Sequence, residues 1–217
     1  MADLERARLQ ELVDVERGIV SREIFVDDDI YRQEQERVFG RAWLFVGHES
    51  QIPNPGDFVA SSMGEESVIL CRDRAGLVHV FLNSCRHRGM KVCRYDEGNT
   101  VEFMCPYHGW SYATDGALVG VPFAKDAYGA QLDKSRWGLV EVAQLERYKG
   151  TVWATWDATA PPFLDYLGGY TVYLDLLLDA WDGRDGGTEV IGGIHKWMIP
   201  ATGSSPRRTS RAIAITA

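Results

Sequence analysis

Two short segments of the chain each combine a cysteine with a histidine. The first reads Cys85-Arg86-His87-Arg88-Gly89, and the second reads Cys105-Pro106-Tyr107-His108-Gly109-Trp110. Two Cys and two His could hold one tetrahedral zinc ion, although Cys-x-His is an uncommon spacing for zinc. The same set suits a [2Fe–2S] cluster in which two Cys bind one iron and two His bind the other. The sequence therefore predicts a metal centre built from Cys85, His87, Cys105 and His108.

Each segment follows a short apolar run, as a loop follows a β-strand. The runs expected to be strands are 43–48, 57–63, 66–73, 77–84, 100–105 and 150–156. Turn-forming residues separate them at 54–56, 73–76 and 96–99. Short strands at this spacing predict a small antiparallel β domain over about residues 40–157, with the candidate ligands in its loops.

The regions on either side of this domain have a helical pattern. Residues 1–20 are expected to form a solvated helix with a thin apolar stripe, and Asp27–Asp29 can cap a second helix over 30–43. The prolines at 160–162 mark a boundary, after which the chain begins a second unit. The apolar run at 170–178 is expected to be one face of a helix rather than a partner site.

The composition narrows the class of protein. The chain has 217 residues, a formal net charge of −8, 45% hydrophobic residues and 25% charged residues. This acidic balance argues against nucleic acid or an anionic membrane as the main partner, because both favour clustered Lys and Arg. No stretch approaches the roughly 20 apolar residues of a membrane helix, and the N-terminal stretch lacks an apolar signal core. Four cysteines in a chain of this size do not suggest a disulfide scaffold. We therefore expect a cytoplasmic protein without a membrane partner.

The other candidate side chains have simpler interpretations. Cys71 and Cys93 have no His at metal spacing and are expected to be buried structural thiols. His79 lies in the middle of a predicted strand, and the isolated His48 and His195 are also expected to be structural. The arginines of the first loop, Arg86 and Arg88, could bind an acidic redox partner or simply form a solvated edge.

The complete pattern, Cys-x-His, seventeen residues and Cys-x-x-His, strongly resembles the Rieske family in its ring-hydroxylating oxygenase branch. The resemblance implies a [2Fe–2S] cluster with Cys85 and Cys105 on a buried ferric iron. It places His87 and His108 on the outer iron, which changes oxidation state and faces the electron donor.

Two differences separate the chain from respiratory Rieske proteins, which resemble it but add one cysteine to each loop and join the two as a disulfide. Met90 and Tyr107 stand at those positions here, and Trp110 stands where the respiratory type has Ser. Fewer hydrogen bonds to sulfur imply a potential toward the low end of the Rieske range, which runs from about −150 to +300 mV.

The resemblance extends beyond the two loops to the α subunit of aromatic ring-hydroxylating dioxygenases. Residues 43–58, 118–123 and 150–157 are similar to that subunit, and residues 186–200 are similar to the start of its catalytic domain. The implied fold is mainly β, a Rieske domain of small stacked antiparallel sheets with N-terminal helices and an incomplete α+β catalytic start. The expected divisions are 1–39, a helical segment; 40–157, the Rieske domain; 158–200, the catalytic start; and 201–217, an aberrant tail.

This resemblance implies a function and partners. Relatives pass electrons from a ferredoxin or reductase through the cluster to a mononuclear Fe(II), which supports O₂-dependent dihydroxylation of an aromatic ring. They assemble as α₃ or α₃β₃, so other α subunits and a β subunit are expected partners. The alternative is a stand-alone Rieske ferredoxin. Residues 160–200 argue against it, because an electron carrier has no use for the start of a catalytic domain. A zinc-binding module is a third possibility.

The last seventeen residues have a different composition, with three Arg, no acid and no aromatic residue. After the position of Pro200, the family usually continues as CNWKFAAENF-x-GD-x-YH. Residues 201–216 can be assigned codons that encode this family sequence when the reading frame is shifted by one base toward the 5′ end. We therefore expect a one-base deletion near Pro200, which the coding DNA would reveal. No His follows His195, so the chain would lack the family's first ligand to the mononuclear iron. It would therefore not bind that iron and would be catalytically inactive alone.

Overall fold

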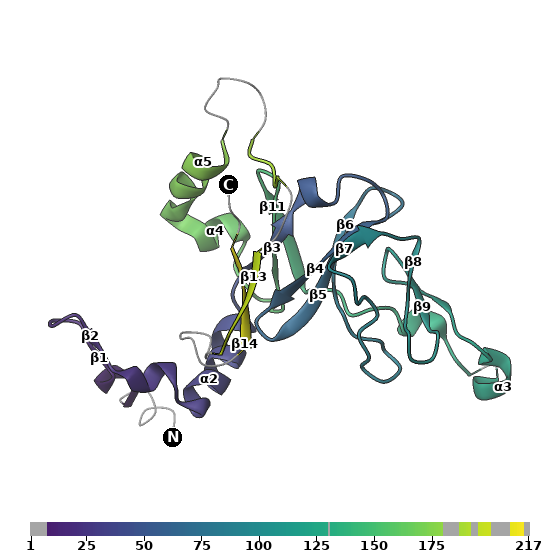
Figure 1. Ribbon diagram of the computed structural model, residues 1–217, viewed down its shortest axis with the longest axis horizontal. Helices are drawn as coiled ribbons and strands as arrows, with labels where there is room; N and C mark the ends of the chain where they lie inside the picture. The colour runs from purple at the N-terminus through teal and green to yellow at the C-terminus, as the bar shows by residue number, and fades with distance from the viewer. Residues whose placement is uncertain (1–7, 130, 180–186, 192–194, 201–208, 215–217) are drawn as a thin grey trace. The chain divides into compact units, whose positions relative to one another are not determined.

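The computed structural model describes residues 8–129, 131–179, 187–191, 195–200 and 209–214 (Figure 1). The chain divides into two compact units. One unit consists of Met1–Arg41 with Gly192–Ala217, and the other of Ala42–Ile191. All four candidate ligands lie in the larger unit.

Three antiparallel sheets form the framework of the larger unit. Their strand orders are β6-β5-β4-β7, β11-β12-β3 and β10-β9-β8. The strands are β3 (Leu44–His48), β4 (Asp57–Met63), β5 (Glu66–Arg72), β6 (Val78–Leu82), β7 (Glu97–Asn99), β8 (Glu102–Met104), β9 (Ser111–Ala113), β10 (Leu118–Gly120), β11 (Gln144–Tyr148) and β12 (Thr151–Thr155). The expected mainly β fold of small antiparallel sheets is confirmed.

Short helices connect and flank these sheets. They are η3 (Glu49–Gln51), α3 (Ala124–Tyr128), η4 (Lys134–Arg136), α4 (Phe163–Leu167), η5 (Gly168–Tyr170) and α5 (Thr171–Leu178). In Figure 1, α4 and α5 lie on the opposite side of the four-stranded sheet from β8 and β9. The helix expected over 170–178 is present as α5.

The predicted turn at 96–99 is wrong, because residues 97–99 form β7 and pair with β4. Asp-Glu-Gly-Asn contains turn-forming residues, but long-range contacts override that preference. A Cβ on Gly98 would lie 3.0 Å from the ring of Phe58, so the glycine here provides space. The side chain of Asn99 donates to the carbonyl of Pro55 and to Asp57 at 3.0 and 2.8 Å.

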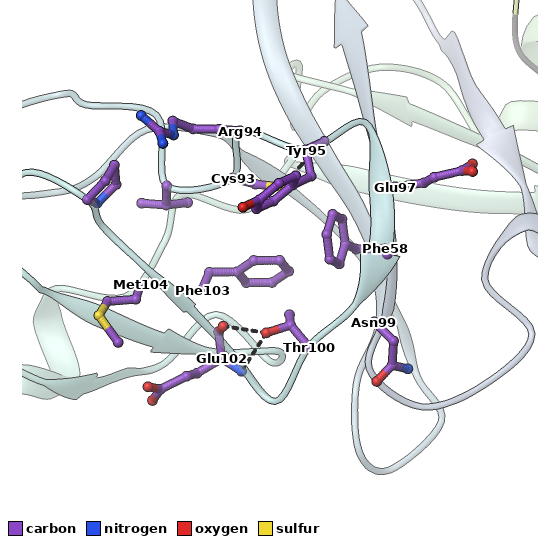
Figure 2. Close-up of a pocket in the computed structure, with 13 residues that line it drawn as sticks. Phe58, Cys93, Arg94, Tyr95, Glu97, Asn99, Thr100, Glu102, Phe103 and Met104 are labelled. Atoms are coloured by element: carbon purple, nitrogen blue, oxygen red, sulfur yellow. Dashed lines mark hydrogen bonds between the residues drawn. The ribbon is translucent and has the colours of Figure 1, made fainter.

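The core of the larger unit lies directly beneath the two ligand loops. Phe58 and Phe103 pack edge to face, with ring centroids 5.5 Å apart at 75° (Figure 2). Cys85 and Cys105 belong to the same buried cluster as these rings. Because interiors of this kind are close-packed, the core restricts where the two cysteines can lie.

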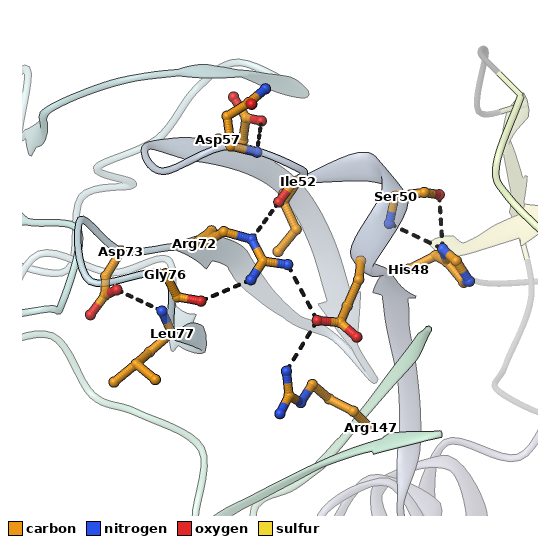
Figure 3. A network of polar contacts seen from close by, with 11 residues as sticks. His48, Ser50, Ile52, Asp57, Arg72, Asp73, Gly76, Leu77 and Arg147 are labelled. Atoms are coloured by element: carbon orange, nitrogen blue, oxygen red, sulfur yellow. Dashed lines mark hydrogen bonds and ion pairs between the residues drawn. The ribbon is translucent and has the colours of Figure 1, made fainter. Parts of the chain in front are cut away.

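A half-buried arginine joins separate parts of the larger unit (Figure 3). Arg72, at the end of β5, donates to the carbonyls of Ile52 and Gly76, both at 2.8 Å. It also donates to Glu49 at 3.2 Å, and Glu49 accepts from Arg147 of β11 at 3.1 Å. The network therefore links the four-stranded sheet to the sheet that contains β11.

The helix predicted over 1–20 is wrong for residues 13–20, which form the hairpin β1 (Val13–Asp14) and β2 (Ile19–Val20). Residues 8–11 are helical, and residues 1–7 lie outside the described residues. Gly18 has φ +64°, and Asp14 accepts from the backbone N–H of Arg17 at 3.0 Å. These two features favour a turn at the point where the apolar stripe predicted a helix.

The second predicted helix is present but shorter than expected. It follows η1 (Arg22–Phe25) and consists of α2 (Asp28–Glu34) and a π-helical turn, η2 (Gln35–Phe39). Asp27 caps it as expected, accepting from the N–H groups of Asp29 and Ile30. It ends before Gly40 rather than at residue 43.

The C-terminal part of the smaller unit contains β13 (His195–Pro200), which pairs antiparallel with β14 (Thr209–Ala214). The expected structural role of His195 concerns a side chain outside the described residues. Most of the expected aberrant tail, residues 201–208 and 215–217, is also outside them. Among the described residues, no helix is both long enough and apolar enough to span a bilayer.

Candidate metal centre

The first ligand loop is a tight turn closed by backbone hydrogen bonds. The N–H of Cys85 donates to the carbonyl of Met90 at 2.8 Å, and the N–H of Gly89 donates to the carbonyl of Cys85 at 2.8 Å. Gly89 has φ +72°, a conformation that glycine adopts without the Cβ clash of other residues. This turn presents Cys85 and His87 at the end of β6.

The second ligand loop repeats the same pattern. The N–H of Cys105 donates to the carbonyl of Trp110 at 2.8 Å, and the N–H of Gly109 donates to the carbonyl of Cys105 at 2.9 Å. Gly109 has φ +71°, and a Cβ there would lie 2.9 Å from Pro122. The glycine is therefore required both for the turn and for close packing against residue 122.

The two loops bring all four predicted ligands together. Cys85 and Cys105 are 3% and 2% exposed, and interaction with the thiol of Cys85 adds to the burial that raises the pKa of Cys105. The rings of His87 and His108 lie 4.7 Å apart between centroids, at 69°. His87 is half-buried and His108 is exposed, so the pair forms the outer side of the site above the cysteines.

An unpartnered atom in this site fits a metal ligand. The Nδ1 atom of His87 is buried and has no hydrogen-bond partner among the described residues. A buried polar atom without a partner is unfavourable, and coordination to a metal would satisfy it. The residues present therefore fit the group that their spacing predicts.

The arrangement favours two metal ions over one. Within the described part of the chain, no three His, Cys, Asp or Glu side chains are placed to hold a single metal ion. A tetrahedral zinc needs all four ligands around one point, whereas each iron of a [2Fe–2S] cluster takes only two from the protein. Two buried thiols and two imidazoles on the outer side would supply two protein ligands to each iron of such a cluster.

The protonation of the ligands follows from their surroundings. Burial, with further contributions from His108 and Arg88, lowers the pKa of His87 and so favours the neutral imidazole, the form that binds metals. Burial raises the pKa of Cys105, whose thiol would lose its proton on binding a metal.

The indole ring of Trp110 packs against the first candidate ligand histidine, His87. The rings of His87 and Trp110 stack with centroids 5.1 Å apart and 8° between their planes. Trp110 is buried and in turn contacts Tyr128 and Trp137, with centroids 6.2 and 6.1 Å away. The position that holds Ser in respiratory Rieske proteins therefore supplies a packing surface here.

Tyr112 contacts the first cysteine, a role that the sequence alone did not indicate. Its hydroxyl accepts from the backbone N–H of Arg86 at 3.0 Å and lies 3.3 Å from the sulfur of Cys85. Because the N–H occupies a lone pair, the hydroxyl hydrogen is free to point at the sulfur. Burial, then the hydrogen bond with Cys85, raises the pKa of Tyr112, so the hydroxyl stays protonated.

The arginines of the first loop differ in their contacts. Arg86 and Arg88 are both exposed. The guanidinium carbon of Arg86 lies 5.7 Å from the ring centroid of Trp137, within cation–π range. The structure therefore places positive charge on the surface beside His87.

The remaining cysteines have other partners. The thiol of Cys71 donates to the carbonyl of Thr114 at 3.4 Å, and burial raises its pKa to about 12. The thiol of Cys93 donates to the carbonyl of Tyr95 at 3.4 Å. Both thiols are buried, in agreement with the expected structural roles.

His79 and His48 also make structural contacts. His79 lies between Glu141 and Asp73, with nitrogen–oxygen distances of 2.8 and 3.2 Å. His48 caps the N-terminus of η3, where its Nδ1 accepts from the backbone N–H of Ser50 at 3.1 Å.

A cavity of about 440 Å³ lies beside the second loop (Figure 2). Phe58 and Phe103 contribute to its lining, together with the oppositely charged Arg94 and Glu97. It reaches the loop at Pro106 but contains none of the four candidate ligands.

The fold and the paired loops define a class of protein. The family model described as the Rieske [2Fe-2S] domain matches residues 42–145. The structure is similar to naphthalene 1,2-dioxygenase from Rhodococcus sp. bound to indole, with a TM-score of 0.82 and 46% identity, over 91% of this chain and 44% of that one.

The sequence comparisons narrow this class to one subunit. The chain is 49% identical to the biphenyl 2,3-dioxygenase α subunit of Rhodococcus jostii (strain RHA1), over 89% of this chain and 41% of the relative. It is 44% identical to the benzene 1,2-dioxygenase α subunit of Pseudomonas putida, over 89% of this chain and 42% of the relative. The chain belongs to the family of Rieske-type aromatic ring-hydroxylating dioxygenase α subunits and spans about two fifths of these relatives' length.

Proposed function

We propose that Cys85, His87, Cys105 and His108 hold a [2Fe–2S] cluster that relays single electrons within an aromatic ring-hydroxylating dioxygenase. The observation that carries this proposal is the convergence of two equivalent loops, with two buried thiols, two imidazoles on the outer side and a buried Nδ1 of His87 that has no partner in the part of the chain that the structure describes. When bound, the cluster accepts one electron and passes it on.

The chain's own residues prepare this site. Cys85 and Cys105 supply thiolates from the buried side, and the two imidazoles supply neutral nitrogen ligands from the outer side. Trp110 holds the plane of His87, while the hydroxyl of Tyr112 neutralises part of the charge on the sulfur of Cys85. Burial of the thiols limits their access to water and oxidants.

The activity proposed for the whole protein is O₂-dependent dihydroxylation of an aromatic hydrocarbon, since the relatives are biphenyl and benzene dioxygenases. This chemistry also needs a mononuclear Fe(II) held by a catalytic domain. We propose residues 40–157 as the electron-transfer domain and 158–200 as the start of the catalytic one. A polypeptide of these 217 residues is expected to bind the cluster without hydroxylating an aromatic compound.

The proposed partners are a ferredoxin or reductase in the cytoplasm, further α subunits and a β subunit. Exposed Arg86 and Arg88 lie on either side of His87 in the sequence. Such a basic edge favours an acidic electron donor, because opposite charges accelerate association.

The test is to purify the 217-residue chain without oxygen and to measure iron, acid-labile sulfide, zinc and the electron paramagnetic resonance (EPR) spectrum after reduction. Two irons and two sulfides per chain, with a Rieske-type spectrum, are expected. Stoichiometric zinc without sulfide would contradict the proposal. Product formation from an aromatic substrate by this polypeptide with a competent donor would contradict the expected inactivity.

Replacing Tyr112 with Phe is expected to lower the midpoint potential. The hydroxyl hydrogen bond stabilises the more negatively charged, reduced form, and its loss costs roughly 1.4 kcal/mol, equivalent to about 60 mV for one electron. Redox titration followed by EPR measures the shift. Tyr128→Phe is the matched control, since Tyr128 contacts Trp110 rather than a ligand sulfur. Equal potentials in Tyr112→Phe and the unmodified chain would exclude this role.

A further inference from the structure

One buried side chain, Asn83, joins the two ends of the first ligand loop. It lies two residues before Cys85 and is 4% exposed. Its carbonyl oxygen accepts from the backbone N–H groups of Val92 and Cys93 at 3.0 and 2.9 Å. Its amide nitrogen donates to the carbonyl of Cys93 at 2.8 Å and to the hydroxyl of Ser67 at 3.3 Å. All four hydrogen-bonding positions of this amide are therefore used.

The second ligand loop is closed differently. Its two ends belong to β8 and β9, which pair directly, with Met104 opposite Ser111. The chain leaving the first loop forms no strand at residues 92–93. In the first loop, one asparagine side chain supplies the connection that a strand pair supplies in the second.

The loop residues to which Asn83 is hydrogen-bonded lie in the buried cluster that contains the two candidate ligand cysteines. Val92 and Cys93 are buried in the same apolar cluster as Cys85 and Cys105. The N–H groups of Val92 and Cys93 and the carbonyl of Cys93 all bond to the amide of Asn83. Removing the amide would leave these buried groups unsatisfied, and the loop would have to move to restore their partners.

We propose that Asn83 is a positioning residue that fixes the geometry of Cys85 and His87 by tying residues 92–93 to the end of β6. This inference rests on the proposed cluster site, and it assigns to Asn83 an effect on the cluster in addition to an effect on folding. Hydrogen-bonded neighbours of metal ligands control how tightly the metal is held.

The test compares Asn83→Ala with the unmodified chain, both prepared with cluster and without oxygen. The rate of iron release to a ferrous chelator is expected to rise about 10-fold, the lower end of the 10–100-fold loss of metal affinity that follows removal of a group bonded to a ligand, because Asn83 acts through residues 92–93. The EPR spectrum of the reduced protein is expected to shift or broaden at a temperature where circular dichroism shows both proteins folded. A purely structural role would lower the unfolding temperature and leave that spectrum unchanged.

A second variant covers the case in which Asn83→Ala does not fold. Asn83→Asp has the same shape and keeps both acceptor bonds to Val92 and Cys93, but it loses the donor bond to the carbonyl of Cys93. Its release rate is expected to fall between those of the alanine variant and the unmodified chain, and its buried carboxylate is expected to lower the cluster potential.

Two controls separate the loop-facing bonds from general effects. Ser67→Ala removes only the 3.3 Å contact outside the loop. Asn99→Ala removes an amide that donates at 3.0 and 2.8 Å in a different turn. Both controls should keep the spectrum and release rate of the unmodified chain.

Each outcome has a distinct meaning. Suppose that the unmodified chain binds a cluster and that the folded Asn83 variants have the same spectra and iron-release rates. That result would overturn the role of Asn83 but not the proposed function. Absence of a cluster from the unmodified chain would overturn the proposed function and this inference with it.

Discussion

Replacing Cys105 with Ala is expected to abolish cluster binding, the largest effect that any single substitution should have on this site. One iron would be left with a single protein thiolate, that of Cys85, which is 3% exposed. Loss of a ligand is more severe than the roughly 10–100-fold loss of affinity that follows removal of a group that only orients one. Iron and sulfide content should fall below about one tenth of the unmodified level, and the EPR signal should disappear.

Cys71→Ala is the matched control for this substitution. Cys71 is fully buried like the ligand cysteines, and its thiol bonds to the carbonyl of Thr114. The control should keep the full cluster content even if it lowers the stability. A Cys105→Ala protein with unchanged iron and spectrum would show that the ligand assignment is wrong, as would equal losses in both variants.

Gly116→Ala is expected to destabilise the larger unit by about 2–5 kcal/mol, the sum of left-handed strain of about 1–2 kcal/mol and overpacking of about 1–3 kcal/mol. Gly116 has φ +83°, and a Cβ there would lie 2.6 Å from the ring of Phe81. Phe81 is 1% exposed, so its ring has little room to move. The turn at Gly116 connects β9, which carries Tyr112, to β10, and strain there should also disturb the site.

Gly76→Ala separates the two contributions. Gly76 has φ +87°, but a Cβ there would meet no atom within 4 Å. It should therefore cost only the left-handed strain of about 1–2 kcal/mol. Urea unfolding of both variants in the same cluster state measures the difference. Equal losses would show that the contact with Phe81 contributes nothing, and a Gly116→Ala variant of unchanged stability would contradict the close packing of Gly116 against Phe81.

The central strands β4 and β5 were predicted well because each is an apolar run followed by a turn. The run at 57–63 has the same bounds as β4, and the run at 66–73 ends one residue beyond β5. These central strands are buried on both faces, which produces continuous apolar runs in the sequence. The candidate ligand pairs were recognisable for a similar reason, since two residues separated by one or two positions lie close together in any fold.

Other elements have no such local signal. The strand β11 includes the exposed Glu146 and Arg147, and it exists because it pairs with β12. The three residues of β7 follow the composition of a turn but pair with β4. The hairpin at 13–20 reverses a helical pattern through Gly18. In each case pairing or a special backbone angle overrode intrinsic preference.

The sequence by itself determined the types and spacing of the candidate ligands and indicated the family, because those properties are local. The tertiary structure decided which distant groups support the ligands. It placed the hydroxyl of Tyr112 against the sulfur of Cys85 from 27 residues away, and it tied residues 92–93 to Asn83. These contacts join segments that only the folded sheets bring together. Whether a hydrogen bond forms depends on differences of a few tenths of an ångström in the donor–acceptor distance, and the spacing of residues along the chain does not specify that distance.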